Sequence, residues 1–140
     1  MQFEKTWQKP NQDMIDVVCG VIFDQGKVFL CRRKPEKQRG GYWEFPGGKI
    51  EEAESPENAL KRELKEELEM EIAEIRFFHA TVHEYENITI RLLAFTCKFV
   101  ASTYKMTDHD TFEWMCIEHL PNKMIAPADL PIVEKLLADK

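Results

Sequence analysis

Apolar and polar residues follow two different periods along this chain. Between residues 16 and 33, two β-branched and apolar runs, DVVCGVIF (16–23) and KVFLCRR (27–33), flank Asp24-Gln25-Gly26. Apolar runs of strand length on either side of such a short polar turn predict a β-hairpin. Residues 34–41 are polar and contain proline and glycine, which predicts a loop, and residues 42–45 predict a brief aromatic strand.

A helical period replaces the strand pattern at residues 56–69. Ser55 is a preferred N-cap residue, and Pro56 fits the first helical turn, where its missing N–H costs nothing. An apolar stripe at helical spacing follows, made of Ala59, Leu60, Leu64 and Leu68.

The second half of the chain predicts more strands and a closing helix. Residues 72–84 and 88–100 are strand-like, with Glu86-Asn87 near the turn, and residues 111–117 predict a short strand. Residues 127–138 predict a second helix, in which Pro131 is tolerated in the first turn or so. Strands interspersed with two helices predict an α/β fold with a mixed sheet covered by helices. No repeat or long linker divides the chain, so we expect a single domain over residues 1–140.

Composition narrows the function classes. The chain has 140 residues, 44% of them apolar, which suits one globular core. Its net charge is -6 and its basic residues are scattered, so we expect no nucleic-acid polymer as partner; a free nucleotide suits it if a metal ion lies between the two anions. The polar N-terminus and the absence of a long apolar segment predict no membrane partner. Four widely spaced cysteines predict buried free thiols in a reducing cytoplasm: Cys19, Cys31, Cys97 and Cys116.

Three glutamates border the apolar stripe of the first helix. Arg62 lies four residues before Glu66 and can pair with it, but Glu63 and Glu67 then lack an obvious local counter-charge. A solvated run of charge is the ordinary interpretation. Clustered carboxylates beside a buried face are also what a hard divalent cation binds. Just upstream, residues 45–48 (FPGG) offer backbone that a ligand can approach without meeting a side chain.

The segment GKIEEAESPENALKRELKEELEM (48–70) resembles the Nudix box, G-x5-E-x7-R-E-U-x-E-E-x-G-U, in which U is apolar. The matching positions are Gly48, Glu54, Arg62, Glu63, Leu64, Glu66, Glu67 and Met70. One position departs, because Glu69 stands where the family has glycine. We expect this residue to lose the usual left-handed C-cap and to alter the helix end slightly. Metal chemistry should be intact, since that position contributes no ligand.

Flanking segments extend the resemblance to the MutT-like branch, which cleaves nucleoside triphosphates to a nucleoside monophosphate and diphosphate. They are WEFPGGKIE (43–51), the pair Asp108-His109 with Trp114, and APADLPIVEKL (126–136). The resemblance implies an α/β/α sandwich and a Mg²⁺ or Mn²⁺ cofactor. It implies metal ligands at Glu63, Glu66, Glu67 and the carbonyl of Gly47, with Gly48, Glu54 and Arg62 as structural support of the site.

Metal held by these glutamates would offset phosphate charge, lower the pKa of a bound water and keep the attacking and leaving oxygens in line. One carboxylate must also accept the water's proton. Glu63, Glu66 or a loop acid could do so, and Asp108 occupies the place where the family has a late catalytic acid. A loop-capping role for Asp108 stays open.

Three residues are candidates for substrate binding by resemblance. Arg32 matches a phosphate contact, although a surface arginine on an edge strand is the alternative. Phe45 matches a wall of the base pocket, although it could equally be core. Asp129 matches a reader of the base edge. An ionised aspartate only accepts hydrogen bonds, so it favours N4 of cytosine or N1 and N2 of a guanine-like base.

The favoured hypothesis is a nucleoside-triphosphate pyrophosphohydrolase that removes oxidised or modified nucleotides such as 8-oxo-dGTP, or that acts on cytidine nucleotides, as a monomer or homodimer. A second hypothesis is hydrolysis of a dinucleoside polyphosphate or a nucleotide sugar. A third is a nucleotide-binding module without catalysis, to which the substitution at Glu69 would point.

Overall fold

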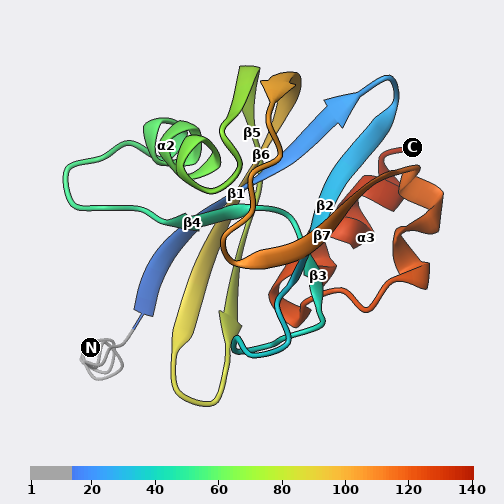
Figure 1. The fold of residues 1–140 in the computed structure, drawn as a ribbon. Helices are drawn as coiled ribbons and strands as arrows, with labels where there is room; N and C mark the ends of the chain where they lie inside the picture. The colour runs from blue at the N-terminus through green and yellow to red at the C-terminus, as the bar shows by residue number, and fades with distance from the viewer. Residues whose placement is uncertain (1–13) are drawn as a thin grey trace.

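The computed structural model describes residues 14–140 (Figure 1). The expectation of a polar N-terminal segment without a signal core concerns residues 1–13, which lie outside the described part. Within residues 14–140, no helix combines the length and the apolar character that a membrane crossing requires.

A mixed sheet forms the centre of the molecule, as predicted. Strands β1 (Met14–Asp24) and β2 (Lys27–Arg33) form the expected hairpin, and its tight turn places Gln25 and Gly26 at φ 51° and 78°. Strand β6 (Thr89–Ser102) pairs parallel with β1, and β5 (Met70–Glu84) pairs antiparallel with β6. The strand order is β3-β2-β1-β6-β5.

Three short strands complete this sheet. Strand β3 (Trp43–Glu44) pairs with β2, as does β7 (His109–Met115), which begins two residues before the predicted strand. The sequence interpretation missed β4 (Gly47–Lys49), which pairs antiparallel with β1. Glycines are depleted in strands, but here the contact requires one, because a Cβ on Gly47 would lie 1.8 Å from the carbonyl oxygen of Val18.

Helix α2 (Pro56–Leu68) matches the prediction closely. The Ser55 hydroxyl accepts a hydrogen bond from the Asn58 N–H at 3.1 Å, and the apolar stripe is fully buried. The predicted helix over residues 127–138 is divided. Two 3₁₀ segments, η1 (Ile117–Asn122) and η2 (Pro127–Asp129), precede helix α3 (Leu130–Ala138). Pro131 has no N–H with which to continue an α-helical ladder backwards, so α-helix begins only around it.

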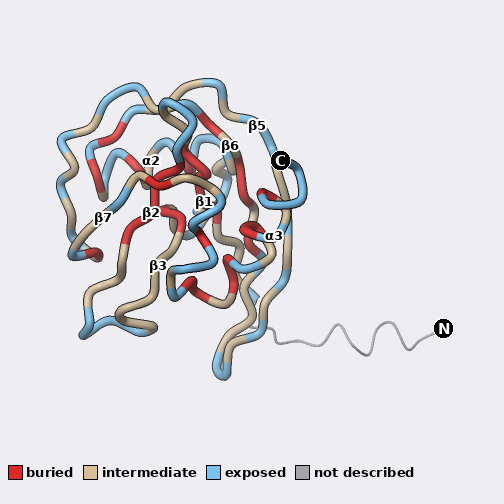
Figure 2. The backbone as a smooth tube through the Cα atoms, turned by 90° about the vertical axis from the view of Figure 1, so that its right-hand side faces the viewer, coloured by how far each residue is buried: buried red, intermediate tan, exposed pale blue. Residues whose placement is uncertain are grey.

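Two separate cores lie on opposite faces of the sheet. Val18 and Ile22 of β1 pack with α2, whereas Cys19 and Val21 pack with η1, η2 and α3. This alternation is the period of two that a strand imposes. Helix α2 therefore covers one face and α3 the other (Figure 1), and the buried positions of β1 and β2 lie between them (Figure 2). The α/β/α sandwich is confirmed.

The expectation of a lost C-cap at Glu69 is wrong. Glu69 adopts the left-handed conformation (φ 50°, ψ 45°), and its N–H is directed at the carbonyl oxygens of Leu64 and Lys65. Its side chain accepts a hydrogen bond from the Thr103 hydroxyl at 2.7 Å. A non-glycine residue in this conformation costs roughly 1 to 2 kcal/mol. Despite this cost, the helix ends in the left-handed conformation at Glu69.

Candidate active site

Arg62 organises the acidic face of α2. Its Nε lies 2.7 Å from Glu54 Oε2, and its Nη2 donates to Glu54 Oε1 and to the carbonyl oxygen of Lys49, both at 3.0 Å. Its Nη1 donates to Glu63 at 3.1 Å and to Glu66 at 3.2 Å. The predicted pairing with Glu66 is confirmed, whereas the expectation that Glu63 lacks a counter-charge is wrong. One guanidinium thus fixes the loop before α2 and two of its carboxylates.

Glu63 lies directly against the glycine pair of β4. A Cβ on Gly48 would lie 2.4 Å from Glu63 Oε1, so only glycine admits the carboxylate here. Burial raises the pKa of Glu63 above its ordinary value, although the hydrogen bond from Arg62 opposes this effect. The carboxylate is therefore half-shielded from water and close to the backbone of β4.

Glu67 and Asp108 meet across a sequence separation that no local pattern bridges. Their side chains share a hydrogen bond. Burial, with the added charge of Glu63, raises the pKa of Glu67 to about 8. Burial also raises the pKa of Asp108, but the hydrogen bonds from Lys37 and Glu67 outweigh it, and this pKa lies below its ordinary value. Of the two carboxyl groups, Glu67 has the raised pKa and Asp108 the lowered one, so Glu67 is the group that is protonated more readily.

The donor chemistry of this region suits a hard divalent cation. Glu63 and Glu67 are one turn apart on α2 and offer partly shielded carboxylate oxygens. The space left by Gly48 brings the first of them against β4. Glu66 points outward, with a side chain 60% exposed, and is engaged by Arg62. In the described part of the chain no three acidic, histidine or cysteine side chains converge into a closed ligand set.

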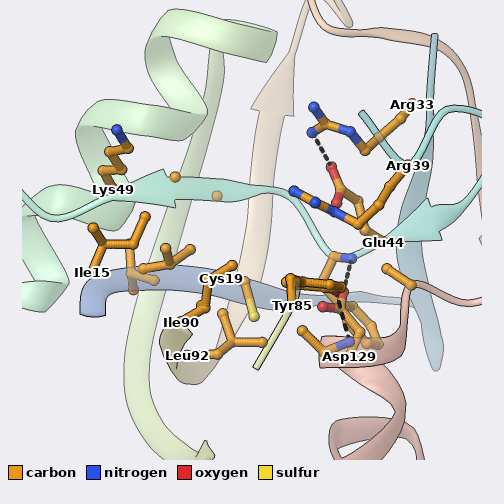
Figure 3. A pocket seen from close by; sticks show the side chains of 17 residues that line it. Ile15, Cys19, Arg33, Arg39, Glu44, Lys49, Tyr85, Ile90, Leu92 and Asp129 are labelled. Carbon is orange, nitrogen blue, oxygen red and sulfur yellow. Dashed lines mark hydrogen bonds and ion pairs between the residues drawn. The ribbon is translucent and has the colours of Figure 1, made fainter. Parts of the chain in front are cut away.

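A cavity of about 260 Å³ opens beside the glycine strand (Figure 3). Phe45 and Asp129, the two residues predicted to contact the base, both line it, as do Gly47 and Gly48. The Phe45 N–H donates to Asp129 Oδ2 at 2.8 Å. Phe45 is also only 3% exposed and belongs to the core on the α3 side. Phe45 therefore belongs to the core and also lines the cavity, and its role as a wall of a base pocket stays a prediction.

Glu44 is a cavity residue that the sequence interpretation missed. Its Oε2 accepts a hydrogen bond from Arg33 Nη1 at 3.1 Å and lies 2.8 Å from Nε2 of His109, which is buried. With one oxygen held in this way, Glu44 presents a second carboxylate to the cavity beside Asp129. The only sign of this role in the sequence is that Glu44 is a charged residue between two aromatic residues.

Arg32 does not lie in the cavity. It forms a bidentate pair with Asp110 at 2.9 and 3.1 Å, whereas Arg33 lines the cavity. Adjacent residues on a strand face opposite sides, so the choice between the two arginines depends on which face of β2 meets the cavity. Of the predicted residues, the structure groups Glu54, Arg62, Glu63 and Glu66, joins Glu67 to Asp108, and collects Phe45, Gly47, Gly48 and Asp129 around the cavity.

Comparison with known proteins decides the family. The sequence pattern of the NUDIX domain matches residues 14–136, which include every site residue described above. The chain belongs to the Nudix family. The Nudix segment is the acidic helix with its preceding glycine strand, so the family expected from residues 48–70 is confirmed.

Several Nudix relatives resemble the chain over most of its length. CTP pyrophosphohydrolase of Escherichia coli (strain K12) is 34% identical over 125 residues, which cover 89% of this chain and 93% of the relative. An 8-oxo-dGTP diphosphatase of Proteus vulgaris is 38% identical over 86 residues, covering 61% of this chain and 77% of the relative. Both names describe hydrolases that act on nucleotides.

Solved Nudix structures agree with the fold. The solution structure of the E. coli ORF135 protein is 34% identical, with a TM-score of 0.79 and coverage of 91% of each chain. The MutT protein of methicillin-resistant Staphylococcus aureus 252 is 33% identical, with a TM-score of 0.68 and coverage of 93% of this chain and all of that one. A MutT Nudix hydrolase from Burkholderia pseudomallei, 21% identical with a TM-score of 0.80, supports the fold alone.

Proposed function

We propose that this Nudix protein hydrolyses nucleoside triphosphates to a nucleoside monophosphate and diphosphate, removing oxidised or modified nucleotides or acting on cytidine nucleotides. One observation carries the proposal. Gly47 and Gly48 line the cavity, and Gly48 also lies against the Glu63 carboxylate. A cavity that can take a base and a carboxylate cluster that can take metal-bound phosphates therefore share one strand.

At the phosphate end, Glu63, Glu66, Glu67 and the Gly47 carbonyl would hold Mg²⁺ or Mn²⁺. When bound, such an ion neutralises phosphate charge and lowers the pKa of a bound water. Asp108 is the residue we assign to accept the water's proton. The ion pair with Lys37, whose Nζ lies 3.2 Å from Asp108 Oδ1, lowers the pKa of this carboxyl, which supports its assignment as the ionised proton acceptor. Arg62 and Glu54 hold the helix and the preceding loop in register.

At the base end, Glu44 and Asp129 supply two carboxyl groups. Glu44 Oε2 is engaged by Arg33 and His109, which leaves Oε1 to accept from an exocyclic amino group. Burial and the nearby charge of Glu44 raise the pKa of Asp129 well above its ordinary value. In its protonated form this carboxyl both donates and accepts. That pattern suits cytosine, guanine or 8-oxoguanine, in agreement with the names of the two relatives.

The test is diphosphate release from a panel of normal and oxidised triphosphates in Mg²⁺, scored by kcat/KM. Glu66→Gln and Glu67→Gln should abolish turnover of every triphosphate while the protein stays folded. Glu57→Gln, an exposed change on the same helix, is the matched control and should leave turnover unchanged. Unchanged turnover in both site variants would refute the metal assignment.

Two alternative functions would use the same site: hydrolysis of another nucleotide derivative, and nucleotide binding without catalysis. ADP-ribose and a diadenosine polyphosphate, supplied beside the triphosphates, test the second substrate class. Tight nucleotide binding in calorimetry with no product over hours would favour a binding module. The retained left-handed geometry at Glu69 argues for catalysis, because the helix end keeps its form despite the missing glycine.

The proposal also covers the domain organisation, the compartment and the oligomeric state of the protein. We assign it one domain over residues 1–140, acting in the cytoplasm as a monomer or homodimer. Its free thiols suit a reducing compartment, since Cys19, Cys31 and Cys97 are buried and unpaired. Light scattering after size exclusion distinguishes the two oligomeric states.

A further inference from the structure

Three segments that are distant in sequence meet at the mouth of the cavity. The Arg39 guanidinium, from the β2–β3 loop, lies 4.4 Å from the centroid of the Tyr85 ring, which belongs to the β5–β6 turn. The Tyr85 hydroxyl accepts a hydrogen bond at 3.1 Å from the N–H of Ala128, next to Asp129. All of these residues line the cavity, and in Figure 3 the Arg39 side chain runs between Glu44 and Tyr85.

The loop that carries Arg39 is tightly built. Arg39 has a left-handed backbone (φ 58°), and its carbonyl accepts from the Tyr42 N–H at 3.2 Å. The N–H of Gly40 donates to the Lys37 carbonyl at 3.0 Å, and a Cβ on Gly40 would lie 2.4 Å from the Pro35 carbonyl oxygen. The backbone that carries Arg39 is therefore held in a defined turn.

The guanidinium retains unused hydrogen-bond donors. Among residues 14–140, no carboxylate lies within the 4.0 Å of an ion pair with Arg39, although Glu44 and Asp129 line the same cavity. Its charge does reach one of them, since Arg39 opposes the burial that raises the pKa of Asp129. The lining of the cavity therefore includes two carboxyl groups and a planar guanidinium with five N–H donors.

We propose that Arg39 is a specificity-determining residue, which donates to a carbonyl oxygen of the base while Glu44 and Asp129 contact its amino or imino edge. The ring of Tyr85 supports the guanidinium from one face by a cation–π contact. The inference rests on the proposed function and names its substrate class. The bases favoured carry a carbonyl on the edge that also carries hydrogen-bond donors, as guanine and cytosine do, whereas adenine has no carbonyl.

A pair of substrates tests the contact with the carbonyl. The triphosphates of deoxyguanosine and of 2-aminopurine deoxyriboside both have the 2-amino group, but only the first has a carbonyl at C6 and the N1–H beside it. The carboxyl groups contact N1–H, so the part of the preference that depends on Arg39 reports the carbonyl. Wild-type protein should favour the first in kcat/KM. Arg39→Met keeps the length of the side chain and removes every donor, so the ratio should fall by about tenfold or more, the usual effect of losing a charge-assisted hydrogen bond.

Controls separate donation from simple loss of charge. Arg76→Met removes an exposed arginine on β5, outside this cavity, and should leave the ratio unchanged. Arg39→Lys keeps charge and a donor but loses the planar fork, so it should restore part of the ratio. An unchanged ratio in Arg39→Met, whether kcat/KM stays the same or falls equally for both substrates, would overturn the inference. Thermal unfolding midpoints within a few degrees of wild type show that the variants are folded.

Tyr85 gives an independent check on the supporting ring. Tyr85→Leu removes the aromatic face and should lower the ratio in the same direction as Arg39→Met. Tyr85→Phe keeps the face, loses only the bond to Ala128 and should keep the ratio. Equal effects of the two changes would contradict the cation–π role. If wild type hydrolyses no triphosphate, the proposed function fails; if it does so with no dependence on Arg39, only this inference fails.

Discussion

Glu67→Gln should stabilise the metal-free protein at neutral and alkaline pH, although it should abolish activity. The Glu67 carboxyl is buried beside Glu63 and Asp108, and its pKa is raised to about 8 from an ordinary value of 4.5. In the unfolded chain it titrates near its ordinary value. Between these two values the folded protein holds a proton that the unfolded chain has released, so stability falls as pH rises through this window. Glutamine stays neutral and avoids the loss.

The size of the effect follows from the displacement of the pKa. The full shift corresponds to about 5 kcal/mol at pH 8 and above, at 1.36 kcal/mol per unit. The side chain remains partly exposed, and water and local adjustment reduce the cost of its charge. We therefore expect Glu67→Gln to raise the free energy of unfolding by about 2 kcal/mol at pH 8, and by close to zero at pH 4.5.

Urea denaturation in EDTA, at intervals from pH 4.5 to pH 9, measures this difference directly. The gap between variant and wild type should widen up to about pH 8 and then stay level. Adding Mg²⁺ should reverse the order at high pH, since the ion stabilises the folded wild type through this carboxylate and the variant much less. A gap that is independent of pH, or a variant less stable than wild type at pH 8 in EDTA, would refute the reasoning.

Three further changes test other parts of the site. Gly48→Ala places a methyl group 2.4 Å from the present position of Glu63 Oε1, so kcat should fall at least tenfold with a small change in the unfolding midpoint. Glu69→Gly relieves the left-handed strain but loses the bond to Thr103; we expect a gain of about 0.5 kcal/mol in urea denaturation and unchanged kcat. Arg33→Ala removes one of the two partners of Glu44 Oε2 and should raise KM severalfold, whereas Arg32→Ala, which breaks an exposed ion pair, should change KM less than twofold.

Local sequence determined the acidic helix almost completely. Ser55, the apolar stripe and the spacing of Glu63 and Glu67 all act within a few turns of one element, so covalent proximity and helical period are enough to place them. The paired strands β1 and β2 follow for the same reason, since a two-residue turn joins them. Even the family could be assigned at this level, because its motif is contiguous.

Local sequence was insufficient wherever backbone geometry depends on a distant partner. Glycines at 47 and 48 indicated backbone open to a ligand and gave no sign of a strand, but pairing with β1 made them one. Glu69 was expected to end the helix differently, but packing and the bond from Thr103 hold the left-handed cap. In both cases tertiary contacts outweighed residue preferences worth about 1 kcal/mol.

Which side chains meet in the cavity depends on the tertiary structure. Glu44, Arg39, Tyr85 and Asp129 come from four separate segments, and their meeting depends on strand order and register. Register also decides that Arg33 and not Arg32 enters the cavity, because a shift by one residue exchanges the two faces of a strand. The sequence by itself therefore determined the acidic helix that we propose to bind metal, whereas the folded sheet decided which side chains line the cavity beside it.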